Sequence, residues 1–401
     1  MSRSYLNRRT APHITTLVLA TTTGALAMNV FVPALPAMAR YFETDYAIMQ
    51  LAVSFYIGAT AILQLFIGPA SDRFGRRPVM LICLGIFNLA TLAAIFAPSI
   101  GYLLLFRTLQ GFAAAGMVLS RAIVRDTVGA DLAASRLGYI TMGMTLAPML
   151  GPAIGGVLDE WFGWQSTFLL TLGMGCLAFL VVFADMGETN KSPSSSLGAQ
   201  FAAYPELLRS RRFWGYTATA AFTSGGFFAF LGGAPYISSE VLRLSPSVYG
   251  AYFAIISLGY MTGNFLSGRL AARLGINRMM LSGNVIAGLG SLLALGLYAS
   301  GFLHPIALFG PAFFTGIGNG VTLPSANAGM VSVRPHLAGS ASGLGGALQI
   351  GGGGAMSIIS GVLLTPESNV VPLFTIMLLT AVAAIVVNLY VIHVARQAGE
   401  L

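Results

Sequence analysis

A short charged segment separates two long apolar runs early in the chain. Residues 68–78 read GPASDRFGRRP and place Asp72 among Arg73, Arg76 and Arg77. A carboxylate in this setting forms charge-assisted hydrogen bonds with guanidinium groups, or it accepts hydrogen bonds from the N-terminus of a helix. Such contacts are reversible. The segment therefore predicts a conformational latch, which closes in one state of the protein and opens in another.

The candidate members of this latch follow from their position on the same side as the charged segment. We expect Asp72 to pair with Arg76, Arg121 or Arg125. The alternative is a solvated loop acid that serves only membrane topology. The set predicted for the latch is Gly68, Asp72, Arg73, Gly75, Arg76, Arg77, Arg121, Arg125 and Asp126.

A second copy of the charged segment occurs 200 residues later. Gly268, Arg273 and Gly275 in GRLAARLGINR repeat two glycines and one arginine of the first copy at the same spacing, whereas Ala272 replaces Asp72. The repeat indicates two related halves. We therefore expect the latch residues to belong to the first half, and the second half to respond to whether the latch is open or closed.

Arg107 is the one charge that falls well inside a predicted membrane span. A charge near the bilayer centre costs roughly 2.5–3.5 kcal/mol on insertion scales, so Arg107 must face a wet cavity or a partner. Either it makes a substrate cavity electropositive, or it bonds helix carbonyls, Asn29 and Gln110 and never meets a substrate. The 13 acids offer no partner, because we expect Glu43, Asp45, Asp159, Glu160, Glu240 and Glu367 outside the membrane and Asp72, Asp126, Asp131, Asp185, Glu188, Glu206 and Glu400 inside the cell.

The elements that position these residues are long apolar helices. Hydrophobic residues make up 56% of the chain and charged residues 8%, against about a quarter charged in soluble proteins. A spanning helix needs roughly 20 apolar residues. Twelve segments qualify: 13–35, 48–69, 79–97, 101–123, 134–158, 164–186, 212–237, 247–270, 279–300, 304–327, 339–364 and 371–394.

These spans predict an all-α membrane protein with twelve transmembrane helices in two pseudo-symmetric six-helix bundles. A polar stretch divides them six and six, so we expect bundles in residues 1–186 and 213–401 and a cytoplasmic linker in 187–212. With both termini in the cytoplasm, 18 of the 21 Lys and Arg residues lie at cytoplasmic helix ends. This positive-inside distribution explains the net charge of +8 without a nucleic-acid partner.

The fifth span is rich in glycine and proline. The stretch GMTLAPMLGPAIGG contains Pro148, Gly151, Pro152, Gly155 and Gly156. Small residues let membrane helices approach closely, and proline and glycine permit bending. Two roles remain open for this segment: tight packing alone, or rocking of one half on the other.

Polar and aromatic residues at mid-span are the further candidates for a substrate cavity. Aromatic rings offer apolar contact with a polar handle, and amides offer directional hydrogen bonds. Packing or lipid contact is the competing role for each aromatic residue. With Arg107, Asn29 and Gln110, the predicted substrate-binding set includes Tyr56, Tyr139, Phe222, Phe228, Tyr252, Asn264, Asn319 and Gln349.

Several of these motifs together resemble a known family. The segment GPASDRFGRRP resembles the signature between helices 2 and 3 of the major facilitator superfamily, and RTLQGFAAAG, which includes Arg107 and Gln110, resembles its helix 4 motif. The glycine-rich fifth span resembles the helix 5 motif of its proton-driven exporters. NVFVPALP at residues 29–36 and the pair Arg125 and Asp126 resemble Bcr/CflA-type multidrug efflux transporters.

The resemblance implies a secondary transporter that exports drugs or antibiotics by alternating access as a proton antiporter. It implies a multi-pass protein of the bacterial inner membrane, and we expect a monomer without metal or cofactor, driven by the proton motive force. The alternative is a facilitated or proton-coupled carrier of a small metabolite on the same fold. An enzyme is disfavoured because no buried acid–base pair or HExxH motif is present, and a channel because duplicated Gly/Pro-broken helices suit alternating access better.

One position departs from the resembled group. Related exporters commonly have Asp in helix 1 where this chain has Asn29, which carries neither a charge nor a proton. A cavity with Arg107 and no carboxylate predicts a preference for neutral or anionic substrates. The source of proton coupling stays open: Asp72, Asp126 or Asp185 serves from the cytoplasmic side, the substrate carries the proton, or transport is uncoupled.

Overall fold

The computed structural model describes residues 6–8, 10–127, 130–190, 204–334, 337–364 and 370–397. Every regular element within these residues is helical, and no strand occurs among them. Each of the twelve predicted spans falls on a helical segment. The all-α prediction is therefore confirmed for the part of the chain that is described.

The first half is built from α1 to α8. Its first span is interrupted: α1 ends at Asn29, and a short 3-10 turn leads into α2. The fourth span is divided in the same way by η2. The elements are α1 (Ile14–Asn29), η1 (Val32–Ala34), α2 (Leu35–Tyr41), α3 (Tyr46–Phe74), α4 (Arg76–Ile95), α5 (Ile100–Gln110), η2 (Gly111–Ala113), α6 (Ala114–Thr127), α7 (Ala130–Phe162) and α8 (Gln165–Asp185).

The second half runs from α11 to α16 and is preceded by a short helix, α10, within the predicted linker. A π-helical turn, η3, extends α11 at its end. The elements are α10 (Tyr204–Leu208), α11 (Arg211–Tyr236), η3 (Ile237–Val241), α12 (Pro246–Leu274), α13 (Ile276–Ala299), α14 (Pro305–Ser332), α15 (Ala338–Leu363) and α16 (Val371–Gln397).

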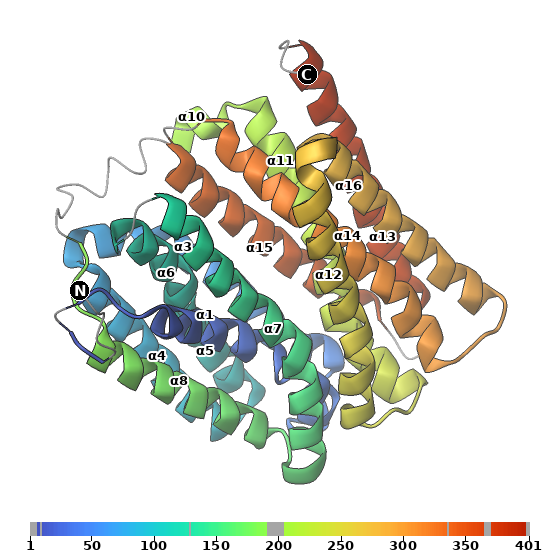
Figure 1. Ribbon diagram of the computed structural model, residues 1–401. Helices are drawn as coiled ribbons and strands as arrows, with labels where there is room; N and C mark the ends of the chain where they lie inside the picture. The colour runs from blue at the N-terminus through green and yellow to red at the C-terminus, as the bar shows by residue number, and fades with distance from the viewer. Residues whose placement is uncertain are drawn as a thin grey trace.

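Nine helical segments in the described residues are long and apolar enough to cross a membrane. The other predicted spans lie in α7, α11 and α12, which are 33, 26 and 29 residues long. Figure 1 shows the result as two helical bundles side by side, the first drawn in blue to green and the second in yellow to red.

The repeated charged segment forms the same turn in both halves. Gly75 between α3 and α4 has φ +98°, and Gly275 between α12 and α13 has φ +79°. Their N–H groups donate to the carbonyls of Ser71 and Ala271, which closes the preceding helix. A positive φ is readily adopted only by glycine, so the repeated glycine positions are a requirement of the turn.

The two ends of the molecule differ in charge. The helix ends and loops on one side carry Arg76, Arg77, Arg273 and most of the other described arginines, and we call this side the basic end. The opposite end includes the α2–α3, α4–α5 and α13–α14 connections. The separation matches the predicted distribution of charge, in which most Lys and Arg residues lie on one side of the twelve spans.

The two halves share one hydrophobic core at the opposite end. A single apolar cluster there joins Phe31 and Val32 of the first half to Phe228, Leu231 and Phe253 of the second. Burial of this surface provides a non-directional attraction between the halves. The halves are therefore closed against one another at this end.

At the basic end each half has a core of its own. Met80 and Leu119 belong to a cluster within the first half, whereas Phe213 and Met330 belong to a cluster within the second. Leu65 of α3 packs against the second cluster. The division into two cores is what distinguishes the basic end from the closed end.

Glycines of the fifth span bring backbones together, as the sequence predicts for small residues. A Cβ added at Gly155 would overlap the carbonyl of Val30 at the end of α1, within the first half. A Cβ at Gly156 would overlap the carbonyl of Pro246 in the second half. Likewise, a Cβ at Gly250 of the second half would overlap the carbonyl of Pro152. The segment thus packs on α1 with one face and joins the halves with another.

A matched pair of substitutions tests this packing. We expect Gly155→Ala to lower the stability by roughly 1–3 kcal/mol, because the overlapped atom is backbone and cannot rotate away. Gly173→Ala in α8, where nothing lies within 4 Å, should leave stability unchanged or slightly raised. Thermal unfolding of the purified variants measures both effects, and equal melting temperatures would refute the assigned contact.

Candidate functional site

An ion-pair network occupies the α3–α4 turn at the basic end. Arg76 lies between two acids: its Nη1 is 2.6 Å from Asp72 Oδ1, and its Nε is 3.0 Å from Asp126 Oδ2 on α6. Its Nη1 also donates to the Ser71 hydroxyl. The Arg76 side chain is only 10% exposed, so these contacts are shielded from solvent more than surface pairs are. Of the three arginines expected to pair with Asp72, Arg76 forms the ion pair in the structure.

The other predicted latch residues make separate contacts. Arg77 donates to the Phe183 carbonyl at 3.2 Å, and Arg73 stacks on Phe74 at 5.3 Å. Gly68 packs against Val118 of α6. Arg121 is exposed and forms no ion pair with an acid that the structure describes, and the Arg125 side chain lies outside the described residues.

Glu188, just after α8, caps the first turn of α4. Its carboxylate accepts hydrogen bonds from the backbone N–H groups of Arg76 at 2.9 Å and Arg77 at 3.2 Å. The Asn190 amide donates to the Asp72 carbonyl at 2.8 Å. The sequence suggests Asp72 for a helix-capping role, whereas Glu188 holds it in the structure. An acid close behind a long helix was the available signal, but the sequence does not reveal which helix it reaches.

The described side-chain partners of this network all belong to the first half. Asp72, Arg76, Asp126 and Glu188 bond one another and their neighbours, and none bonds a described residue of the second half. In this state of the molecule the basic end is where the halves have separate cores. The described side chains of the network thus bond only within the first half, at the end where the halves have separate cores.

Arg107 lies inside the first bundle and is 1% exposed. Its guanidinium donates to the carbonyls of Ala52 at 3.0 Å and Ala27 at 3.3 Å and to the Gln110 side chain. Phe31 and Tyr56 flank it, with ring centroids 4.1 and 4.5 Å from Cζ. These contacts fit the second of the two roles considered for Arg107, in which it bonds helix carbonyls and Gln110. Asn29, which was also expected as a partner, is not among them.

The residues predicted near Arg107 are bonded within the same bundle. Gln110 donates to Thr91 at 2.9 Å, and the Tyr56 hydroxyl donates to the Gly24 carbonyl at 2.7 Å. Asn29 donates to the Ala25 carbonyl at 2.7 Å, while its own side-chain oxygen is buried without a partner in the described structure. Arg107, Gln110 and Tyr56 thus form one group, and Asn29 bonds separately.

The candidates of the second half do not join this group. Asn264 and Asn319 each donate to a carbonyl one turn earlier in their own helix, at 2.9 and 3.0 Å. Tyr252 stacks on Phe309 at 5.3 Å. Phe228 is buried, and Phe222 and Gln349 are half-buried. Tyr139, a candidate on α7 of the first half, is 53% exposed.

Asp185 anchors the start of the chain. Its carboxylate accepts hydrogen bonds from the backbone of Leu6 and His13, both at 2.8 Å, and from the Thr16 hydroxyl at 2.6 Å. The residue is 1% exposed. A buried carboxylate that accepts three hydrogen bonds from the first residues of the chain is fixed in place, which suits an anchor.

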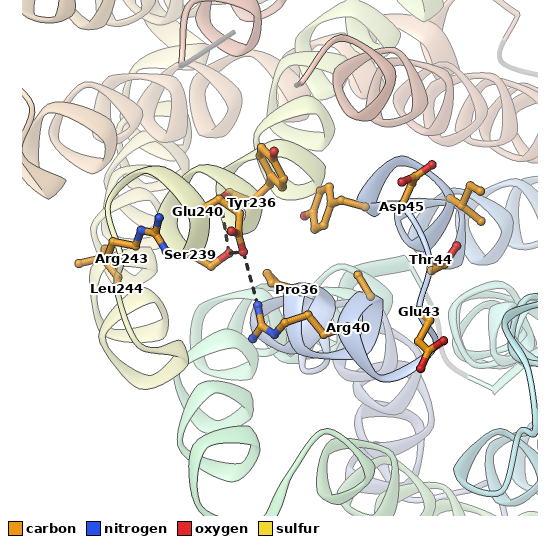
Figure 2. A pocket seen from close by; sticks show the side chains of 13 residues that line it. Pro36, Arg40, Glu43, Thr44, Asp45, Tyr236, Ser239, Glu240, Arg243 and Leu244 are labelled. Carbon is orange, nitrogen blue, oxygen red and sulfur yellow. Dashed lines mark hydrogen bonds and ion pairs between the residues drawn. The ribbon is translucent and has the colours of Figure 1, made fainter. Parts of the chain in front are cut away.

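A cavity of about 930 Å³ opens at the opposite end, lined by residues of both halves. Figure 2 shows Arg40 of α2 directed at Glu240 of η3. The two side chains form an ion pair at 3.4 Å. The lining of the cavity has both charge signs, with Arg40 and Arg243 opposing Glu43, Asp45 and Glu240. No group of acid, His or Cys side chains fit to hold a metal occurs among the residues described.

The contacts of Arg107 lead to a test of its role. We expect Arg107→Lys to destabilise the protein by on the order of 2 kcal/mol, because an ammonium group cannot donate to all three acceptors while stacked between two rings. Thermal unfolding measures the loss. Unchanged stability, together with an altered charge preference among transported compounds, would instead support direct substrate contact.

Comparisons with known proteins agree with the geometry. The chain matches the Major Facilitator Superfamily over residues 17–254 and 227–400. It is 33% identical over 90% of its length to an uncharacterized MFS-type transporter, YdgK, of Bacillus subtilis (strain 168), covering 90% of that protein. It is 29% identical over 86% of its length to multidrug resistance protein D of Escherichia coli (strain K12), covering 88% of that protein.

Solved structures show the same fold. A bacterial homologue of the human lysosomal transporter Spinster, in an inward-facing and unoccupied conformation, superposes with a TM-score of 0.71 at 18% identity, over 96% of each chain. The two matches to one family cover both halves, and the repeated turn, the glycine-lined contacts and the twelve helical segments fit it. The chain belongs to the Major Facilitator Superfamily.

Proposed function

We propose that the protein exports small molecules, drugs or antibiotics among them, across the bacterial inner membrane by alternating access. The observation that carries this proposal is the pairing of a shared core at one end with two separate cores at the other. Such an arrangement can be reversed by rocking one bundle on the other. Similarity to a multidrug resistance protein over 86% of the chain supports export of drugs rather than uptake of a metabolite.

The orientation follows from charge. The basic end carries Arg76, Arg77 and Arg273, and the positive-inside rule assigns it to the cytoplasm. The opposite end then faces outside, and the shared core closes it. Closure at this end supports an inward-facing conformation, which takes substrate from the cytoplasm or the inner leaflet.

We further propose a preference for neutral or anionic compounds. Arg107 does not carry this preference, because its guanidinium is buried among protein acceptors. The proposed preference rests instead on the positions of the acidic residues. All acids whose side chains are described, including Asp72, Asp126, Asp159 and Asp185, lie at helix ends or in loops, so a cationic substrate would meet none of them at mid-membrane.

Transport into everted vesicles tests the function and the preference together. With an imposed proton gradient, we expect accumulation of neutral or anionic probes against their concentration gradient, at rates at least about 10-fold above that of a quaternary ammonium probe of similar size. Equilibration without accumulation would favour the facilitated carrier. Faster accumulation of the quaternary ammonium probe would contradict the preference.

Proton coupling is proposed to use the Asp72–Arg76–Asp126 network. These two acids share one arginine and are already partly exposed, so breaking either ion pair within the transport cycle changes the charge that faces each carboxylate. Asp185 is the weaker candidate, since three donors hold its carboxylate.

A lumenal pH dye in proteoliposomes measures the coupling. Substrate entering the lumen in exchange for protons should make the lumen alkaline, and Asp126→Asn should reduce this signal by at least about 10-fold while binding persists. The control is Glu206→Gln, which alters the exposed pair with Arg334 at the same end. Full alkalinisation by the Asp126 variant would exclude the network as the coupling group.

A further inference from the structure

Gln50 of α3 inserts its side chain into the second half. The residue lies near the outer end of α3 and is 1% exposed. Its Nε2 donates to the carbonyl of Ser357 on α15 at 2.5 Å and approaches the Ser357 hydroxyl at 3.3 Å. A polar side chain of one half is thus fully buried in the other.

Two glycines create the space that Gln50 occupies. A Cβ added at Gly361 of α15 would overlap the Gln50 side-chain oxygen, and a Cβ at Gly232 of α11 would overlap the Gln50 side-chain nitrogen. With Ser357 these glycines form a slot, which we call the Gln50 slot. Any larger residue at either glycine position would fill it.

Tyr46 makes a parallel contact one helical turn earlier. Its hydroxyl donates to the carbonyl of Gly232 at 2.8 Å, and its ring lies 4.9 Å from that of Tyr236. Residues four apart share one helix face. The outer end of α3 therefore presents two polar groups to the same part of the second half.

The α3–α15 contact loosens toward the cytoplasm. Along α15 toward the cytoplasm, the nearest atom of α3 overlaps a Cβ built at Gly361, lies 3.1 Å from one at Gly354, 3.9 Å from one at Gly351 and 3.8 Å from one at Gly346. Of these four positions, the one at the Gln50 slot is the tightest, and it lies nearest the outer end of the helix pair. Parting the halves on the outside requires the Gln50 side chain to leave.

The slot is also incompletely satisfied. The Gln50 side-chain oxygen is buried and has no hydrogen-bond partner in the described structure. A buried acceptor without a partner offsets part of the gain from the bonds that Nε2 makes. Such a contact closes the outer face but still allows it to open, as a transport cycle demands.

We propose that Gln50 is a gating residue, and that withdrawal of its side chain from the slot formed by Gly232, Ser357 and Gly361 is the step that releases the outer face. The inference rests on the alternating access proposed above. It assigns a specific contact to the outward opening and makes no assumption about the substrate.

Distance measurements on purified protein without substrate test this gate. Spin labels are attached after Ser99→Cys and Leu303→Cys, two exposed positions in outer loops of different halves, in a background with Cys83→Ala and Cys176→Ala. Labels at these positions report the separation of the halves on the outside. Pulsed electron spin resonance in nanodiscs gives the populations of short and long distances.

We expect Gln50→Ala and Gly361→Ala each to raise the ratio of long to short distances by about 5-fold, the ratio that one lost hydrogen bond of ordinary strength supports. The control is Gly351→Ala on the same helix, where an added Cβ would lie 3.9 Å from the nearest atom of α3, an ordinary van der Waals distance. This variant should match the parent.

The double variant separates gating from general damage. The three atoms nearest to a Cβ at Gly361 all belong to Gln50, so Gly361→Ala should have no further effect once Gln50→Ala has emptied the slot. An additive effect, or unchanged distances in both single variants, would overturn the proposal. Because no transport is measured, failure here would leave the proposed export function standing, and failure of export would leave this result unaffected.

Discussion

The arrangement depends on how closely helices of different halves can approach. At the outer end, glycines and the carbonyls of prolines meet without intervening side chains, at Gly156 with Pro246 and at Gly250 with Pro152. Bulky apolar side chains then fill the remaining space as a single core. Without the close backbone approach, the shared core could not exclude water, and the outer face would not be sealed.

Much of the fold follows from the sequence because apolar length and charge position are physical requirements of a bilayer. All twelve predicted spans coincide with helical segments, and the repeated turn at Gly75 and Gly275 has the positive φ that only glycine adopts readily. The breaks after Asn29 and Gln110 were not predicted. Short 3-10 turns depend on local packing, which hydropathy over a window of twenty residues does not resolve.

The site was less predictable than the fold. Residue type correctly singled out Arg107 as a buried charge, but its three acceptors include two backbone carbonyls, which every sequence has and none reveals. The same limit hid Glu188 and Gln50. Each makes contacts with residues more than a hundred positions away, and nothing local marks which of many polar residues will reach such a partner.

The linker between the halves is held on both sides. Glu188 and Asn190 bond the α3–α4 turn of the first half, and Glu206 of α10 pairs with Arg334 of the second at 3.0 Å. The two described ends of the predicted linker 187–212 are thus fastened to different halves, so any change in the spacing of the halves at the basic end also changes the distance between the α3–α4 turn and Arg334 across which the chain must reach.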